Sequence, residues 1–394
     1  MLKTAEDETL SRDLVAWRRH FHRHPELGFK EHDTARFILD TLAVIGGLEV
    51  TYPVAETGIV ALLRGAKPGP TLLVRADMDA LPIHELNDVS YRSTRDGVMH
   101  ACGHDAHMAM QLGAIQQLVA RRAELAGQVK FVFQPAEEGP GGAKPMIDAG
   151  VMLNPTVDAA IGFHIWTPLP VGTIGITEGP CMAHTDEFEI NIQGKGGHGA
   201  APHLSVDSVV VAAHVVTALQ SVVARNVDPV ERAVVTVGKV EAGDRHNIIA
   251  HSARMTGTAR SFAPAIADLL PQRVGAIAHH VCEAFGARCH LDYRNVYPAT
   301  VNDPDMCRRV WASAEKVVGP NKVVAAPASM GGEDMSFFLQ AVPGCYFFIG
   351  AANPEKGANM PHHHPQFAID EDALGVGCAV ITQAVIDFLA SPAP

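Results

Sequence analysis

The chain has 394 residues, of which 47% are apolar and 19% are charged. This length suggests two domains, and the composition supplies enough apolar side chains for sizeable cores without any sign of disorder. The net charge of −12, from 31 Lys and Arg residues against 43 Asp and Glu residues, argues against nucleic acid or an anionic membrane as a partner, because both require a basic surface.

The N-terminal segment MLKTAEDETL lacks the basic start and the apolar core of a signal peptide. Apolar stretches such as residues 206–218 are interrupted by Asp and His and are too short to span a bilayer. We therefore expect a soluble cytoplasmic protein that does not bind membranes. The seven cysteines are odd in number and scattered, so we expect most of them to be small buried side chains.

The first part of the chain predicts two helices followed by strands that alternate with helices. Apolar residues at helical spacing predict helices at residues 10–21 and 31–44. Short runs rich in Val, Ile, Leu or Phe predict four strands, at residues 58–63, 71–74, 128–133 and 157–163. Helical stretches at 106–121 and 144–149 lie among them. This alternation predicts an α/β fold with a largely parallel sheet that helices cover on both faces.

A different pattern begins near Ala183. Its elements are a strand, a long helix, two strands, a second helix and a last strand, predicted at 187–192, 205–224, 234–240, 252–258, 264–285 and 288–296. This β-α-β-β-α-β order matches a small ferredoxin-like domain. The α/β pattern then returns, with a strand at 344–350 and a helix at 371–389.

The simplest topology is one domain interrupted by another. We expect a catalytic metal-binding domain formed by residues 1–182 and 296–394. An inserted lid and dimerisation domain would span residues 183–295.

Acidic and imidazole side chains stand at the ends of three predicted strands. Asp77 and Asp79 follow the second strand, Glu137 and Glu138 follow the third, and His164 ends the fourth. In open α/β sheets, ligands bind beyond the carboxyl ends of the strands. These side chains are therefore expected to converge at one edge of the sheet.

Cys102 and His104 precede a predicted helix and resemble a metal-binding pair, since thiolate and imidazole both suit zinc and similar ions. Alternatively, Cys102 could be a nucleophile with His104 as its base, or the spacing could arise by chance. Adjacent carboxylates such as Glu137 and Glu138 are usually a solvated pair. At the end of a strand, one could bind a metal ion while the other accepts a proton from water.

His164 could equally be an ordinary buried histidine. The run Pro361–Pro365 contains three histidines, which could be an exposed tract without a role or could supply one more imidazole. Together these groups could hold two divalent ions that share a water molecule.

Nine motifs, in this order, resemble the amidohydrolase branch of the bimetallic aminoacylase/carboxypeptidase metallopeptidases. That branch includes hippurate hydrolases, N-acyl-amino-acid amidohydrolases and plant auxin-conjugate hydrolases. The resemblance covers nearly the whole chain and rests on RHFHRHPEL (19–27), RADMDALP (75–82), MHACGHD (99–105), FQPAEEG (133–139), GKGGHG (194–199), NII (247–249), GTARS (257–261), GGED (331–334) and HHPQF (363–367).

The resemblance implies a role for each matching residue. The metal ligands would be Cys102, His104, Glu138, His164 and His363. His363 is chosen because the family pattern is His-x-Pro-x-Phe, although the triple histidine leaves His362 and His364 open. The general base, which would later protonate the leaving amine, is Glu137.

Four more residues would stabilise the oxyanion, bind the substrate or orient the catalytic groups. His198, reaching the active site of a partner subunit, would stabilise the oxyanion. Asn247 and Arg260 would bind the α-carboxylate of the substrate, for which the planar guanidinium is suited. Asp79 would orient a ligand or the base.

Related branches carry His-x-Asp where this chain has Asp77-x-Asp79, so the role of Asp77 stays open. His107 could approach the metal ions, although packing on its helix is the simpler interpretation. His24, Pro25 and Glu26 belong to the resemblance without an assigned chemistry.

The sequence therefore predicts a metal-dependent hydrolase that cleaves the amide bond of N-acyl amino acids. Two divalent ions per subunit (Zn, Mn, Ni or Co) would be its cofactors, and a homodimer would form through an exposed strand edge of the inserted domain. The acyl group and the amino acid are undetermined. The alternatives are a dipeptidase or a deacetylase of another small N-acyl substrate, cysteine-nucleophile catalysis, and a binding protein that keeps the fold.

Overall fold

The computed structural model describes residues 5–390, and the chain divides into two compact units. The second unit comprises Met182–Thr300 and Ser329–Glu333, and the first unit comprises the rest of the described chain. The sequence placed the inserted domain at 183–295. The sequence did not indicate that the separate segment Ser329–Glu333 belongs to the second unit, because only contacts within the folded unit join it to the inserted domain.

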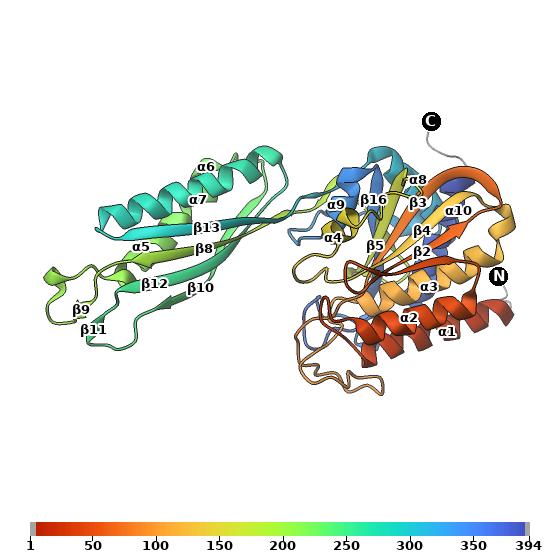
Figure 1. Cartoon of the computed structure of the whole chain (residues 1–394), viewed down its shortest axis with the longest axis horizontal. Coiled ribbons are helices and arrows are strands. Elements are labelled where there is room, and N and C mark those ends of the chain that lie inside the picture. Colours follow the sequence, from red (N-terminus) through yellow and green to blue (C-terminus); the bar gives the residue numbers. More distant parts are fainter. Residues whose placement is uncertain (1–4, 391–394) are drawn as a thin grey trace. The chain divides into compact units, whose positions relative to one another are not determined.

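An eight-stranded sheet forms the centre of the first unit (Figure 1). In spatial order its strands are β1 (Glu49–Val54), β2 (Gly58–Arg64), β4 (Ala126–Gln134), β3 (Lys67–Asp77), β5 (Ala159–Pro170), β16 (Gly344–Ala352), β6 (Ile174–Ile176) and β15 (Val323–Ala325). The pairs β4–β3, β3–β5, β5–β16 and β6–β15 are parallel, and the other three pairs are antiparallel. The α/β class with a mostly parallel sheet is thus confirmed.

Helices cover both faces of this sheet. Side chains alternate along a strand, so Gly162 and Ile165 of β5 face opposite sides. On one face, Gly162 lies against Met335 of α9 (Met335–Ala341), which a Cβ added to the glycine would meet. On the other face, Ile165 lies against Gly103 at the start of α3 (His104–Ala120), since a Cβ added to Gly103 would meet Ile165. The remaining helices of the unit are α1 (Ala5–Arg23), α2 (His32–Ile45), α4 (Ala143–Asp148), α8 (Pro304–Val318) and α10 (Asp372–Ala390).

The last helix, α10, is long and apolar enough to cross a membrane by length and composition alone. In the structure it packs against α3 and α8. Leu374, Val380, Ile381 and Phe388 are buried along it. This burial accounts for its apolar composition, and α10 is a core helix of the first unit.

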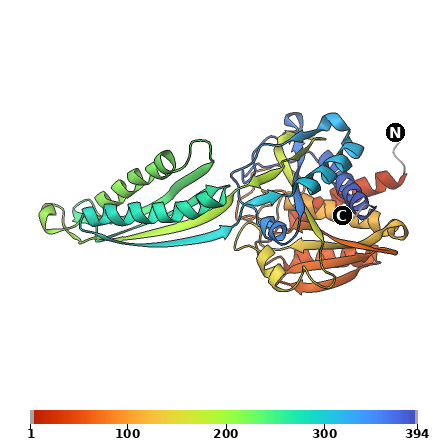
Figure 2. The same ribbon diagram turned by 90° about the horizontal axis from the view of Figure 1, so that it is seen from above.

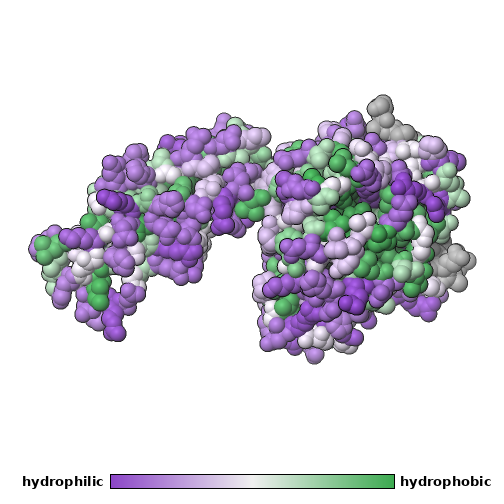
Figure 3. Space-filling view, in the orientation of Figure 1, coloured by the Kyte–Doolittle hydropathy of each residue, from purple (hydrophilic) through white to green (hydrophobic). Residues whose placement is uncertain are grey.

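The second unit is a four-stranded antiparallel sheet with helices on one face (Figures 1 and 2). Its strands, in spatial order, are β10 (Ala233–Ala242), β12 (Ser252–Ser261), β8 (His184–Gln193) and β13 (Arg288–Tyr297). The helices are α5 (Ser208–Leu219), α6 (Ser221–Asn226) and α7 (Pro264–Ala284). The ferredoxin-like order is confirmed, and the visible surface of this unit is mostly hydrophilic (Figure 3).

The helix predicted at 205–224 is shorter and divided. The carboxylate of Asp207 accepts hydrogen bonds from the N–H groups of Val209 and Val210, so it caps α5 and sets its start at Ser208. Gln220 then separates α5 from α6. Pro202–Leu204 forms a separate 3₁₀ turn.

Several elements were not predicted from the sequence. In the first unit these are β1, β6, β15, α8 and α9. The short pairs β9 (Gly197–His198) with β11 (Ile248–Ile249), and β7 (Gly179–Met182) with β14 (Thr300–Asn302), were also missed. Strands of two to four residues are too short for apolar alternation to be recognised.

Candidate metal centre

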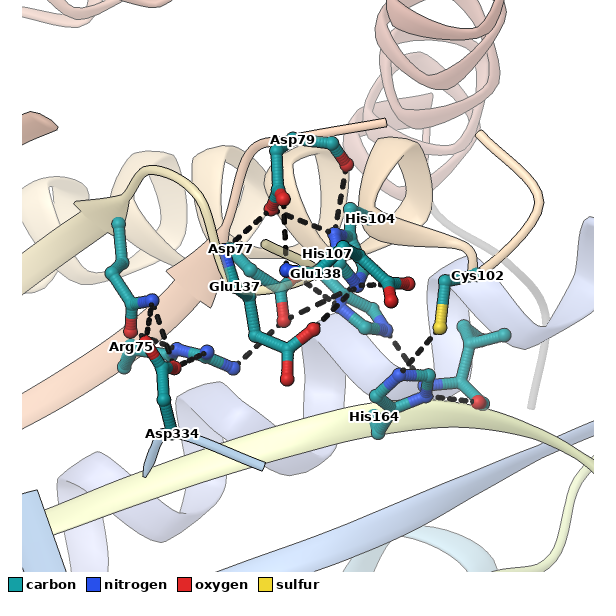
Figure 4. A network of polar contacts seen from close by, with 12 residues as sticks. Arg75, Asp77, Asp79, Cys102, His104, His107, Glu137, Glu138, His164 and Asp334 are labelled. Carbon is teal, nitrogen blue, oxygen red and sulfur yellow. Dashed lines mark hydrogen bonds and ion pairs between the residues drawn. The ribbon is translucent and has the colours of Figure 1, made fainter. Parts of the chain in front are cut away.

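The five residues expected to bind metal ions come together in the first unit. Cys102, His104 and His164 place one ligand atom each within 4.8 Å of one another, and so do Cys102, Glu138 and His363. The residues come from the turn before α3, the first residue of α3, the loop after β4, the strand β5 and the loop before α10 (Figure 4 shows all but His363). Cys102 is the member that the two groups share.

His104 presents an unused nitrogen to this cluster. Gly103 has φ +95°, a left-handed conformation that glycine adopts readily, and it directs the chain into α3. The Nδ1–H of His104 donates to the carbonyl oxygen of Asp79 at 2.8 Å, so the neutral ring would carry its lone pair on Nε2. This Nε2 atom is fully buried and makes no hydrogen bond within the described residues. A buried nitrogen lone pair of this kind fits a metal ion.

His164 has the same arrangement. Its Nδ1–H donates to the carbonyl oxygen of Ile165 at 2.5 Å, and its Nε2 lies 3.3 Å from Cys102 Sγ. Burial and the neighbouring His107 lower the pKa of His164 well below its ordinary value. His164 is therefore a neutral imidazole, which is the form that binds metal ions.

The three histidines of the 361–365 run have different partners. His363, at φ +66°, directs Nε2 to Glu138 Oε1 at 3.1 Å. His362 donates from Nε2 to the carbonyl oxygen of Ile165 at 2.9 Å and packs on Trp166. His364 Nδ1 accepts the N–H of Gln366. Among the three, His363 is the one beside the carboxylate of the cluster.

The charges of this cluster favour a bound cation. Burial lowers the pKa of His104, but the charges of Asp77 and Asp79 outweigh it and raise that pKa to about 10. Burial and the charges of Glu138 and Glu137 raise the pKa of Cys102 well above its ordinary value. The carboxylates therefore attract positive charge to this site, and a metal ion would supply that charge and deprotonate the thiol.

The same shift argues against Cys102 as a nucleophile. Reactive cysteines have a lowered pKa. Here burial and the charges of Glu138 and Glu137 raise the pKa of Cys102 instead. The structure thus gives Cys102 the surroundings of a metal ligand.

Asp79 lies behind the ligands. Its Oδ1 accepts the N–H of Glu137 at 3.0 Å, and its Oδ2 accepts the N–H of Glu138 at 2.9 Å. Its carbonyl oxygen holds His104, as described above. Asp79 therefore links the loop after β4 to the first residue of α3.

Asp77 and His107 form a pair beside the ligands. The Nδ1–H of His107 donates to Asp77 Oδ1 at 2.6 Å, and its Nε2 accepts the N–H of Ile165 at 2.8 Å. Both ring nitrogens of His107 are therefore engaged, so His107 holds the strand next to His164 and does not offer a lone pair to a metal ion. The sequence could not show this, because it depends on the tautomer that Ile165 selects.

An arginine in β3 joins this network. Arg75 donates to Asp77 at 2.7 Å, to Gln134 at 2.8 Å and to Asp334 at 2.8 Å, and all four side chains are buried. The sequence motifs assign no role to Arg75 or Asp334, although an arginine directly after the apolar run 71–74 was a usable signal.

A second buried network explains part of the RHFHRHPEL motif. Asp105, next to His104, contacts Arg18 Nε and His22 Nδ1, each at 2.8 Å. His22 Nε2 lies 3.0 Å from Glu85. These contacts fix the first turn of α3 to α1.

The other three expected residues lie in the second unit. His198 and Asn247 are neighbours, because β9 pairs with β11 and the Gly199 N–H donates to the Asn247 carbonyl oxygen at 2.9 Å. His198 Nδ1 accepts the N–H of Ala200 at 3.0 Å. Arg260 is half-buried on β12, where its Nη1 donates to Thr258 Oγ1 at 2.6 Å.

Known proteins resemble nearly the whole chain. A model described as peptidase family M20/M25/M40 matches residues 73–387. The thermostable carboxypeptidase 2 of Saccharolobus solfataricus is 40% identical over 379 residues, or 95% of each chain. An N-acyl-L-amino acid amidohydrolase of Geobacillus stearothermophilus is 45% identical over 302 residues, 76% of this chain and 80% of its own. The crystal structure of Bacillus subtilis YXEP protein, a dinuclear metal-binding peptidase, matches with a TM-score of 0.82 at 34% identity, over 97% of this chain and 99% of that one.

The shared position of Cys102 predicts an unequal effect of removing single ligands. Cys102→Ala should reduce the bound metal from about two ions per chain to fewer than about one, because both ligand groups lose a member. His164→Ala should remove about one ion. Elemental analysis of the purified protein measures this. Cys307→Ala, at a buried cysteine of the same unit, is the control. A Cys102→Ala protein with the full metal content would contradict the assignment.

Proposed function

The chain belongs to peptidase family M20/M25/M40 and is a metal-dependent amide hydrolase, and from this premise we propose that it cleaves N-acyl amino acids. The observation that carries the proposal is the pair of adjacent carboxylates beside the ligand cluster. Both carboxylates lie 3.9 Å from the unused Nε2 of His104, and Glu138 is also hydrogen-bonded to His363. The additional contact with His363 supports Glu138 as the metal ligand and Glu137 as the residue that transfers a proton.

Cys102, His104 and His164 would hold one divalent ion, and Cys102, Glu138 and His363 the other. Zinc, manganese, nickel and cobalt all suit this mixed donor set. When bound, the two ions polarise the scissile carbonyl and make water more acidic.

Glu137 is the general base in this proposal. Its carboxylate takes a proton from the attacking water and later delivers a proton to the leaving amine, which releases a carboxylic acid and an amino acid. Asp79 supports this task by holding the main-chain N–H of Glu137 at 3.0 Å. The position of the base is therefore set by a second buried carboxylate.

His198 would stabilise the oxyanion, and its tautomer supports this role. Because its Nδ1 accepts the Ala200 N–H, the neutral ring carries its proton on Nε2. That N–H can donate to developing negative charge. Asn247 and Arg260 would bind the substrate carboxylate, and the contact of Arg260 with Thr258 supports this by fixing the plane of the guanidinium.

The proposal includes a homodimer formed through the second unit. Val209 and Val210 on α5 are each 44% exposed, so this helix presents two adjacent apolar side chains at the surface. The strand β10 beside α5 is an edge strand, and such edges readily pair with another chain. His198 would act on the active site of the partner subunit.

A peptidase of short peptides is the second candidate. It is favoured by the 40% identity to the thermostable carboxypeptidase 2 of Saccharolobus solfataricus. The same base and ligands would serve both reactions, and the acyl group distinguishes them. Release of amino acids from dipeptides but not from N-acyl amino acids would favour this candidate.

Replacement of the base tests the mechanism. Glu137→Gln should lower kcat by about 10²–10⁴-fold with unchanged metal content, because the amide cannot accept the proton. Release of free amino acid from N-acetyl and N-benzoyl amino acids measures the rate. Glu124→Gln, at a surface carboxylate, is the matched control. A Glu137→Gln protein as fast as the wild type would refute the role of this residue.

The oxyanion role predicts a loss of rate without a loss of metal. His198→Ala should lower kcat by about 10²–10³-fold, while the metal content stays that of the wild type. His203→Ala, at another histidine of the same unit, should keep the wild-type rate. Steady-state kinetics with elemental analysis decide between them, and an unchanged kcat for His198→Ala would exclude the role.

The dimer depends on the apolar face of α5. Val210→Glu should halve the molar mass measured by light scattering after size exclusion, because an interface cannot bury an unpaired carboxylate. Val230→Glu, at a valine that is 86% exposed in a turn, should leave the mass unchanged. If the Val210→Glu mass equals that of the wild type, the proposed interface is wrong.

A further inference from the structure

A buried carboxylate from the start of α2 binds the loop that carries Glu137. Glu31 is fully buried, and its Oε1 accepts the N–H of Ala136 at 2.9 Å. Its Oε2 accepts the hydroxyl of Thr57 at 2.6 Å. Thr57 and Ala136 are also fully buried. Glu31 therefore joins α2 to the residue that directly precedes the proposed base.

Three successive main-chain N–H groups are held in this way. Glu31 binds that of Ala136, and the two oxygens of Asp79 bind those of Glu137 and Glu138. Two buried carboxylates thus determine the path of the chain at the base and at one metal ligand. Asp79 acts on the latter two residues, and Glu31 acts on the first.

The first of these residues has an unfavourable backbone conformation. Ala136 has φ +56°, a left-handed conformation that is unfavourable for a residue with a side chain. Such conformations persist only where the surroundings enforce them. Close packing contributes, since a Cβ added to Gly28 would lie 2.9 Å from Ala136. The hydrogen bond to Glu31 is the polar contact that holds the same peptide.

We propose that Glu31 is a positioning residue for catalysis, which fixes Ala136 in its left-handed conformation and thereby directs the carboxylates of Glu137 and Glu138. The inference rests on the proposed function, since it takes Glu137 as the base. It assigns a chemistry to the Glu31 carboxylate, which touches neither a ligand side chain nor the base itself.

The ionised form of the buried Glu31 destabilises the fold. Burial and the charge of Asp79, from the turn after β3, raise the pKa of Glu31 to about 7, against the hydrogen bonds from Thr57 and Ala136. A raised pKa stabilises the fold below the ordinary value of 4.5, and this stability is lost as the pH rises through 7. At higher pH the chain keeps a buried anion that destabilises it, which is expected where function requires the group.

Two substitutions separate the hydrogen bond from the charge. In Glu31→Gln, the amide oxygen can accept the Ala136 N–H while the amide nitrogen donates to the Thr57 hydroxyl oxygen. In Glu31→Ala, the Ala136 N–H loses its acceptor. The first variant should therefore retain the loop conformation, and the second should lose it.

Glu26 provides a matched control within the same segment. It is also a buried carboxylate, but its Oε2 accepts from the N–H and hydroxyl of Thr34, and its Oε1 from Arg95. It makes no hydrogen bond to the 136–138 loop in the described structure. Glu26→Ala should therefore affect α2 without affecting the loop.

Amide hydrogen exchange of the full-length, metal-loaded protein is the decisive test. In Glu31→Ala, exchange of the amides of Ala136, Glu137 and Glu138 should be at least about tenfold faster than in the wild type, because a buried hydrogen bond is lost. In Glu31→Gln and Glu26→Ala these amides should exchange at the wild-type rate. Equal exchange in Glu31→Ala and the wild type would overturn the proposal.

Kinetics and stability supply the second readout. Glu31→Ala should lower kcat about 10²-fold with an unchanged KM, since the base is displaced while substrate binding is not. Glu31→Gln should stay within about threefold of the wild-type kcat, and its gain in Tm over the wild type should grow from about pH 5 to about pH 9. If Glu31→Ala does not fold, Glu31→Gln decides, because it keeps an acceptor for the Ala136 N–H. Faster exchange of the amides of residues 136–138 in that variant than in the wild type would then overturn the proposal.

These experiments distinguish two failures. A wild-type protein inactive on every N-acyl amino acid would contradict the proposed function, yet the exchange result would still decide whether Glu31 holds the loop. An active wild-type protein with unchanged exchange and kcat in Glu31→Ala would contradict the role of Glu31 alone.

Discussion

Buried negative charge is the constraint on which the first unit depends. Asp77, Asp79, Glu137 and their neighbours are withdrawn from water at the carboxyl ends of β3 and β4, and a buried charge is costly unless it is paired. Arg75 pairs with Asp77 and also with Asp334. No arginine or lysine of the described residues pairs with the thiol and imidazole donors nearby, and a bound metal ion would supply positive charge there.

Residues behind those donors fix their orientation by hydrogen bonds. His104 is fixed by the carbonyl oxygen of Asp79, and His164 is fixed by the carbonyl oxygen of Ile165. In both cases a hydrogen bond at one position determines which ring nitrogen carries the lone pair, so the tautomers of the ligands are set by residues that never touch the metal. Glu31 extends the same principle to the loop that carries the base.

Much of this could be predicted from the sequence, because strand ends and helix starts position the donors. Apolar runs that end in acidic or imidazole residues indicate one edge of a parallel sheet, which is why Glu138 and His164 were expected to lie close together, as they do in the structure. Hydrogen-bond partners could not be predicted, since they depend on three-dimensional contacts. This is why His107 stayed open, and why His362 and His363 could be told apart only by their contacts with the Ile165 carbonyl and with Glu138.

The central claim is that bound divalent ions make this chain hydrolyse N-acyl amino acids. The most direct test is to remove metal with a chelator and add back Zn, Mn, Co or Ni singly, while measuring the amino acid released from a panel of N-acyl amino acids. The account predicts no activity in the chelated protein and recovery with at least one ion. Hydrolysis that persists at the full rate without metal, or a folded, metal-loaded protein that hydrolyses none of the panel, would contradict it.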